Sequence, residues 1–226
     1  MNWEDECYLL SKRKFRENAN IINVFTPNKG KVTGIVYGGT SRKIRNFLQI
    51  SNKLFVINNS KNENKISYFK PELIKAISPQ FFNDKFRTSA LISTCSILNS
   101  LLPESQPNKD IYKSFEKFIN SLLLDNWIIL YIFFELNLIK ELGYDTNLTS
   151  FNDSLNESQE FKKIEIDEFK YEVPIFLIQK KIPKNTGKTL IKKSLSFTRN
   201  MFLNKFFIPN NLIFPKSRII LENYFN

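Results

Sequence analysis

The sequence predicts an α+β protein, in which a small closed β-barrel in residues 1–78 precedes an α-helical domain in residues 79–226. Short segments rich in β-branched residues dominate the first part, and after Pro79 the apolar residues recur with helical spacing. The 226 residues allow one large domain or two small ones, and a hydrophobic content of 42% suffices for a buried core.

Five short strands are predicted before residue 79. The first covers residues 6–14, and the next two, at 20–26 and 31–38, are separated by the turn sequence PNKG and should form a hairpin. Two more strands are predicted at 52–58 and 65–70. Five short strands in so few residues fit a closed barrel, which leaves no sheet edge exposed.

Five helices are predicted in the rest of the chain from apolar spacing and from prolines at their boundaries. They cover residues 84–102, a segment opening at Pro107, a segment capped by Asp125 and ending near Gly143, residues 188–207, and the residues after Pro215. Residues 144–172 are polar and acidic, and we expect a loop or an irregular insertion there.

The net charge of +11 is unevenly distributed. Residues 1–78 carry fourteen cations and six anions, residues 104–172 carry seven and fourteen, and residues 173–226 carry ten and one. Such a basic chain favours an acidic partner, either nucleic acid or an anionic membrane surface. Two basic regions flanking an acidic one suggest more than one kind of contact.

The residues needed for several classes of chemistry are missing from the sequence. There is no histidine, which is the commonest general base and metal ligand. Only Cys7 and Cys95 are present, so no four-thiolate zinc site can form, and we expect two buried free thiols. No carboxylate pair has a partner motif, so we expect no catalytic residue, no metal ligand and no cofactor.

Neither a signal peptide nor a membrane span is expected. Acidic residues at positions 4–6 replace the basic region of a signal peptide. The most apolar stretch, residues 127–139, is shorter than the roughly 20 residues that a bilayer requires. The sequence therefore predicts a cytoplasmic protein.

Two adjacent glycines precede a cluster of cations in the stretch VYGGTSRKIRNFLQ, residues 36–49. A dinucleotide-binding loop requires the pattern G-x-G-x-x-G, which is absent. The stretch fits a tight exit from a strand, with Thr40 or Ser41 capping a short helical turn that presents Arg42, Lys43 and Arg45. Such cations suit phosphates, although a solvated loop explains the spacing equally well.

Residues 185–189, NTGKT, resemble the end of a Walker A motif. The motif requires a glycine five residues before Gly187, where this chain has Ile182. An ordinary helix start therefore explains the segment better than an ATPase site.

The helix predicted over residues 188–207 combines cations with apolar residues. Its apolar residues are first of all candidates for the core. An exposed edge of the helix would offer an apolar groove with a cationic rim, suited to an acidic peptide with an aromatic end. The candidate contacts are Lys192, Arg199 and Phe202, and the Arg199 guanidinium suits a terminal carboxylate.

Three separated stretches resemble the RecO family of recombination mediators in its alphaproteobacterial form. The first covers residues 1–52 and includes Trp3, the run Glu17-Asn18-Ala19, and Gly38-Gly39 followed by Ser41-Arg42-Lys43. The others are FFELNLIKELGY at 133–144 and FLNKFFIPNNLIFPKSR at 202–218.

The resemblance implies an oligonucleotide-binding barrel followed by a helical domain. It also implies a non-enzymatic protein of DNA repair that binds single- and double-stranded DNA and anneals complementary strands. The implied protein partners are RecR, the C-terminal tail of single-stranded-DNA-binding protein and, indirectly, RecA, with no membrane. An RNA-binding module with the same barrel is the alternative.

The resemblance also indicates which residues of the barrel bind DNA. It implies that Arg42, Lys43, Arg45, Lys31 and Arg13 contact the DNA backbone. Two aromatic residues, Tyr37 and Phe47, are candidates for stacking on bases, although we expect both in the core. Many relatives carry a four-cysteine zinc knuckle after the ELGY segment, where this chain has no cysteine, so no zinc is expected.

Overall fold

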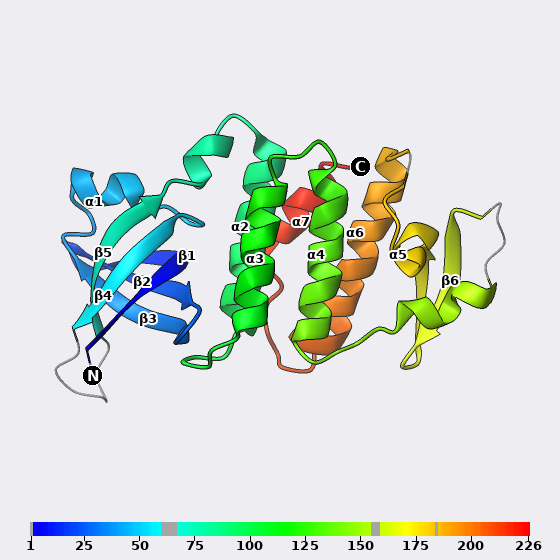
Figure 1. Cartoon of the computed structure of the whole chain (residues 1–226), viewed down its shortest axis with the longest axis horizontal. Coiled ribbons are helices and arrows are strands. Elements are labelled where there is room, and N and C mark those ends of the chain that lie inside the picture. Colours follow the sequence, from blue (N-terminus) through cyan, green and yellow to red (C-terminus); the bar gives the residue numbers. More distant parts are fainter. Residues whose placement is uncertain (1, 60–66, 155–158, 184) are drawn as a thin grey trace. The chain divides into compact units, whose positions relative to one another are not determined.

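The computed structural model describes residues 2–59, 67–154, 159–183 and 185–226 (Figure 1). The chain divides into two compact units. The first comprises Met1–Tyr112 with Pro215–Arg218, and the second comprises Lys113–Phe214 with Ile219–Asn226. The first unit thus extends beyond the barrel, and the domain division between residues 78 and 79 stays a prediction.

Five strands close a barrel, as the sequence predicts, and the structure gives their order as β1-β2-β3-β5-β4 (Figure 1). They are β1 (Trp3–Phe15), β2 (Ala19–Thr26), β3 (Gly30–Tyr37), β4 (Lys53–Asn59) and β5 (Ser67–Lys75). The parallel pair β3–β5 completes the closure and sets Ile35 beside Tyr68, whereas the other neighbouring strands are antiparallel. Residues 65 and 66, which the sequence predicts to begin the fifth strand, lie outside the described residues.

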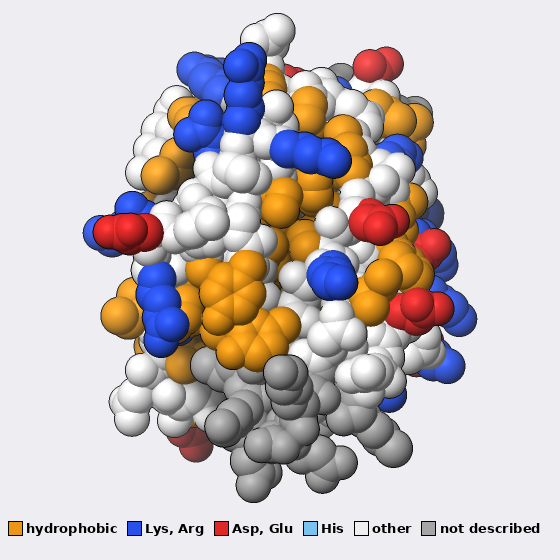
Figure 2. Space-filling view, turned by 90° about the vertical axis from the view of Figure 1, so that its left-hand side faces the viewer, with side chains coloured by type: hydrophobic (Ala, Val, Ile, Leu, Met, Phe, Trp, Pro, Cys, Tyr) orange, Lys and Arg blue, Asp and Glu red, His pale blue; other side chains and the backbone are white. Residues whose placement is uncertain are grey.

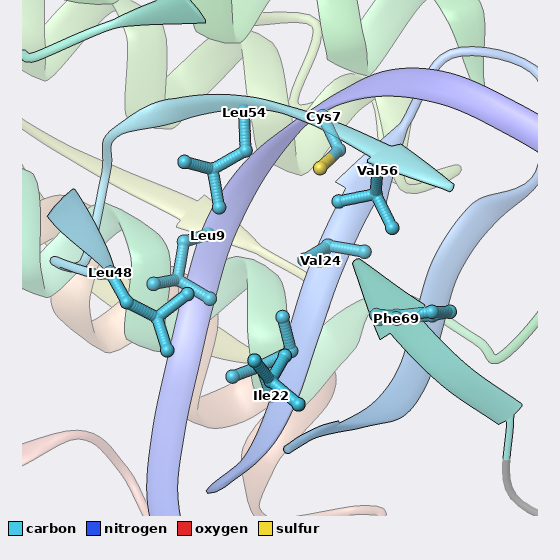
Figure 3. Packing of buried hydrophobic residues seen from close by; sticks show 9 residues of the cluster. Cys7, Leu9, Ile22, Val24, Leu48, Leu54, Val56 and Phe69 are labelled. Atoms are coloured by element: carbon cyan, nitrogen blue, oxygen red, sulfur yellow. The ribbon is translucent and has the colours of Figure 1, made fainter. Parts of the chain in front are cut away.

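Inward-pointing apolar side chains fill the barrel (Figure 3). They alternate along the strands, as side chains of a pleated strand do. The cluster consists of Cys7, Leu9, Ile22, Val24, Val36, Leu48, Leu54, Val56 and Phe69. Gly34 provides room for Phe69, because a Cβ at this position would lie 2.4 Å from the Phe69 ring.

Helix α2 (Lys85–Leu101) belongs to the same unit as the barrel. Its N-cap, Asp84, accepts hydrogen bonds from the backbone N–H groups of Phe86 and Arg87, both at 3.0 Å. The helix contacts the barrel through Asn99, whose side-chain oxygen accepts from the Asn23 amide at 2.7 Å. Cys95 lies buried in this helix, and both cysteines are free, which confirms the expected buried thiols.

The five predicted helices are all present. Besides α2, they are α3 (Lys109–Ser121), α4 (Trp127–Glu141), α6 (Lys188–Phe202), which continues as a π-helical turn over Leu203–Phe207, and α7 (Lys216–Asn223). The N-cap of α4 is Asn126 rather than the predicted Asp125. Helices α4 and α6 lie side by side (Figure 1), and the buried Glu135 carboxylate accepts from Thr198 at 2.5 Å between them. None of the helices among the described residues has the length and apolarity needed to cross a membrane.

The expectation of a loop over residues 144–172 is wrong for its second half. A β-hairpin forms there, from β6 (Phe161–Ile166) and β7 (Phe169–Pro174), and a short helix α5 (Ile175–Gln179) follows. Ile164 and Ile166 are buried and alternate with exposed charged residues, so the period of a half-buried strand is present despite the acidic composition. The ammonium of Lys205 lies 2.6 Å from the Asp167 carboxylate and ties the hairpin turn to the end of α6.

Candidate nucleic-acid interface

Two glycines position the short helix α1 (Arg42–Phe47) at one end of the barrel. Gly38 has a φ of +67°, which few other residues adopt, and its N–H donates to the Asn18 carbonyl at 2.8 Å. Gly39 is needed for space, because a Cβ there would lie 2.6 Å from the Asn20 side-chain nitrogen. The glycine pair thus makes the tight strand exit that the sequence predicts, fixed to the β1–β2 turn.

The predicted helical turn at residues 42–47 is confirmed, but the predicted side-chain cap is not formed. Ser41 is the N-cap residue and makes no side-chain capping bond. The Thr40 hydroxyl donates instead to the Asn18 side-chain oxygen at 3.0 Å. Packing holds the helix in place, since Ile44 and Phe47 lie against the barrel core.

The outer face of α1 presents three cations. Arg42, Lys43 and Arg45 are exposed, and within the described parts of the chain none of them has an ion pair or a side-chain hydrogen bond. The ammonium of Lys12 donates to the carbonyl of Leu48, the residue after α1, at 2.6 Å. Burial lowers the pKa of Lys12, and the nearby charge of Arg45 lowers that pKa further. We call these four residues the end-cap cations, whose like charges a polyanion would neutralise.

The two other predicted DNA contacts lie on the strands β1 and β3. Arg13 is exposed, and because side chains alternate along a strand it points to the opposite face of β1 from Lys12. Lys31 is only 9% exposed, donates to the Asn99 carbonyl at 2.8 Å and lies 3.6 Å from the Glu104 carboxylate. The ammonium of Lys31 therefore holds the barrel to the end of α2, and we leave it out of the interface.

The expected burial of Tyr37 is wrong. Tyr37 is 55% exposed and stacks on Tyr68, which is 38% exposed, with ring centroids 5.2 Å apart and planes at 22°. Tyr37 ends β3 next to the buried Val36, and strand alternation points it out of the barrel. Phe47, by contrast, is partly buried against the barrel core.

Three residues of this surface were missed by reasoning from the sequence. They are Lys12, Tyr68 and Arg16. Arg16 lies in the β1–β2 turn at a φ of 56°, and its position between two predicted strands was a usable signal. Figure 2 shows Lys and Arg side chains gathered at the upper end of the view and exposed aromatic rings below them.

Lys192 and Arg199, the predicted peptide contacts, line one cavity of about 620 Å³ in the second unit. Lys188, Lys193 and Phe225 also line it, and we call this site the α6 cavity. Phe202 is fully buried and does not reach it, so Phe225 supplies the aromatic wall. The Arg199 guanidinium already faces a carboxylate of its own chain, with Nε 3.3 Å from the Glu222 oxygen.

Comparison with known proteins identifies relatives along most of the chain. Residues 1–77 match the family model described as Recombination protein O N terminal. Residues 83–186 match the model described as Recombination protein O C terminal. The first match contains the barrel with its end-cap cations.

Curated relatives are named DNA repair protein RecO. The protein of Wolbachia sp. subsp. Drosophila simulans (strain wRi) is 32% identical over 151 residues, which are 66% of this chain and 62% of the relative. The protein of Roseobacter denitrificans is 32% identical over 145 residues, covering 64% and 60% of the two chains. The matched parts thus span about three fifths of the length of these relatives. Both family models and these relatives show that the chain belongs to the recombination protein O family.

Proposed function

We propose that this protein is a non-enzymatic recombination mediator of DNA repair in the cytoplasm. In this proposal the barrel binds single- and double-stranded DNA and anneals complementary strands. The observation that carries the proposal is the set of three exposed cations of α1, Arg42, Lys43 and Arg45, on a closed barrel in a chain of this family. Arg42, Lys43 and Arg45 are exposed on the helix that follows the glycine turn, where a phosphate backbone can reach them.

Phosphate contacts suit an annealing protein. Each phosphate neutralised by a cation releases condensed counterions, so affinity rises without regard to base sequence and falls with salt. Contacts of this kind fix the strand without reading it. Two complementary strands can therefore be held while their bases remain free to pair with each other.

RNA carries the same phosphates, so an RNA-binding module is the alternative. The cations alone do not distinguish the two nucleic acids. Equal-length DNA and RNA strands separate the alternatives: the mediator should bind DNA at least as tightly as RNA, whereas an RNA-binding module should strongly prefer RNA.

We propose further that the α6 cavity captures the acidic C-terminal tail of single-stranded-DNA-binding protein. Lys188, Lys192 and Arg199 supply cations, and Phe225 supplies an apolar wall. A tail carboxylate would replace Glu222 beside Arg199, where the guanidinium can hold both oxygens. Together with RecR, this contact would bring the protein to coated single strands and help to load RecA.

A second cavity in the same unit provides the alternative tail site. It has a volume of about 590 Å³ and is lined by Phe133 and Leu177 together with Lys140 and Lys180. A fluorescent tail peptide decides between the cavities. Loss of peptide binding in Lys192→Glu supports the α6 cavity, whereas loss in Lys180→Glu alone moves the site to the second cavity.

Strand annealing tests the proposed function. The protein should anneal complementary strands, bare and coated with single-stranded-DNA-binding protein, and the triple variant Arg42→Ala, Lys43→Ala, Arg45→Ala should lose most of this activity. The matched control removes three exposed lysines of α3, at positions 109, 113 and 117, and should anneal normally. No annealing by the unmodified protein, or full annealing by the folded triple variant, would refute the proposal.

A further inference from the structure

The stacked tyrosines of the barrel are unlike its other aromatic residues. Most large apolar side chains of the barrel are buried in the core, whereas Tyr37 and Tyr68 lie with their rings side by side on the surface. Exposing two adjacent aromatic rings to water costs free energy, and a partner that covers the rings would recover it.

Two neighbouring strands, β3 and β5, bring the pair together. Tyr37 ends β3, and Tyr68 lies in β5 opposite Ile35, which points to the same face as Tyr37 because side chains alternate. The rings are nearly parallel, with centroids 5.2 Å apart. The interaction with the Tyr68 side chain raises the pKa of Tyr37.

Cations border the pair. The positive charge of Arg16 partly offsets the raised pKa of Tyr37, and the Arg16 guanidinium lies 5.2 Å from the centroid of the Phe15 ring. The N–H of Gly38, the residue after Tyr37, donates to Asn18 in the turn that carries Arg16. The same glycine turn leads into α1, so Tyr37 lies along the chain between Arg16 and the cations of α1.

We propose that Tyr37 and Tyr68 form a stacking platform for unpaired nucleobases of single-stranded DNA. The inference rests on the proposed binding of DNA by the barrel. A base stacks on the free ring face while its flanking phosphates lie against Arg16 and the cations of α1. Every base has a π-face, so the platform binds without sequence preference.

The platform distinguishes single strands from duplexes. In a duplex the bases are stacked on each other and offer no free face to a protein ring. The end-cap cations bind both forms, whereas the tyrosines contribute only to single strands. The pair therefore holds exposed bases at the barrel until a complementary strand competes for them.

Anisotropy titrations of the full chain with three labelled DNAs of equal length test this inference. The DNAs are an oligothymidine strand, a strand of abasic sites with the same phosphates, and a duplex. The double variant Tyr37→Ala, Tyr68→Ala should bind oligothymidine roughly five- to a hundredfold more weakly, as expected for one lost stacked base. Its affinity for the abasic strand and for the duplex should stay within about twofold, and its salt dependence should not change, because no charge is removed.

Two control variants make the result specific. Tyr37→Phe, Tyr68→Phe keeps both rings and should bind oligothymidine almost normally. Phe82→Ala removes another aromatic residue of the same unit, 65% exposed and outside the barrel strands, and should have no effect.

Each remaining outcome overturns the inference. Unchanged oligothymidine binding in the folded alanine variant shows that the two tyrosines do not stack on bases. The exposed rings would then be a candidate contact for a protein partner. An equal loss on the abasic strand shows that the rings only support the phosphate contacts. Failure of the proposed function itself looks different, because the unmodified protein would then show no salt-dependent binding to any of the three DNAs.

Discussion

The two basic regions of the chain, at its N-terminal and C-terminal ends, have similar net charges but very different surroundings. Residues 1–78 carry a net charge of +8 and residues 173–226 a net charge of +9. In the first region, Arg42, Lys43 and Arg45 are exposed and make no ion pair with any described residue. In the second, Arg199 faces Glu222, and Lys193 lies 3.0 Å from the Glu172 carboxylate.

Two regions of similar net charge thus differ in how many of their cations are free to bind a partner, so net charge alone does not define a binding surface. The exposed cations of α1, Arg42, Lys43 and Arg45, are open to a partner as large as a phosphate backbone. The cations of the α6 cavity are partly neutralised by the chain's own carboxylates, so a partner there must bring carboxylates that replace them. The first arrangement suits a long polyanion, and the second suits a short acidic peptide.

Reversing charge in each region should separate the two activities most strongly. Arg42→Glu with Arg45→Glu should weaken binding to duplex and single-stranded DNA at least about tenfold at physiological salt, because two attractions become repulsions. Lys192→Glu should instead weaken binding of an acidic tail peptide. Anisotropy with labelled DNA and labelled peptide measures both, and a loss of DNA binding in Lys192→Glu would place the α6 cavity on the DNA path.

A substitution of Glu222 tests whether the internal carboxylate competes with a peptide for Arg199. Glu222→Gln removes the internal carboxylate that lies 3.3 Å from the guanidinium. The affinity for the tail peptide should rise several-fold, whereas DNA binding should not change. If peptide affinity falls instead, Glu222 positions Arg199 for the peptide and does not compete with it.

The first unit also contains a carboxylate whose contribution to stability is measurable. Burial tends to raise the pKa of Asp84, but hydrogen bonds from Arg87 and Phe86 outweigh it and leave that pKa below its usual value. Asp84→Ala removes the N-cap of α2 and should lower the free energy of unfolding by about 1 kcal/mol at neutral pH. A lowered pKa stabilises the fold above the carboxyl's unfolded pKa, so the difference should vanish as the pH falls through the folded pKa. Urea titrations at neutral and strongly acidic pH measure it, and a difference that persists in acid would contradict the assignment.

Asp167, a carboxylate of the second unit, should contribute less to stability than Asp84. The hydrogen bond from Lys205, followed by one from Tyr144, lowers the pKa of Asp167, which lies at the exposed hairpin turn. Asp167→Asn should reduce the melting temperature slightly at neutral pH, with the effect disappearing in acid for the same reason as at Asp84. Calorimetry compares the two variants, and a larger effect for Asp167→Asn than for Asp84→Ala would reverse this order.

Much of the fold could be predicted because its signals are local. The strands of the barrel alternate inward and outward residues, and the helices have apolar spacing with prolines near their ends. The β6–β7 hairpin has the same alternation at Ile164 and Ile166, but its acidic composition concealed it.

The surroundings of Lys31 and Tyr68 could not be predicted, because they depend on contacts between distant segments. Lys31 has the sequence context of an exposed lysine, and its partners Asn99 and Glu104 lie about seventy residues further along the chain. Tyr68 lies beside Tyr37 on the surface of the barrel because β5 pairs with β3. The cluster at Arg42, Lys43 and Arg45 was predictable because one short helix contains all three.

The salt dependence of duplex DNA binding tests the central claim, that the end-cap cations contact phosphates. Log affinity should fall linearly with log salt concentration, and the triple variant Arg42→Ala, Lys43→Ala, Arg45→Ala should have a slope smaller by up to roughly 3 units, at about 0.9 per lost phosphate contact. The control variant without Lys109, Lys113 and Lys117 should retain the original slope. An unchanged slope in the folded triple variant, or an equal change in the control, would contradict the claim that α1 binds the DNA backbone.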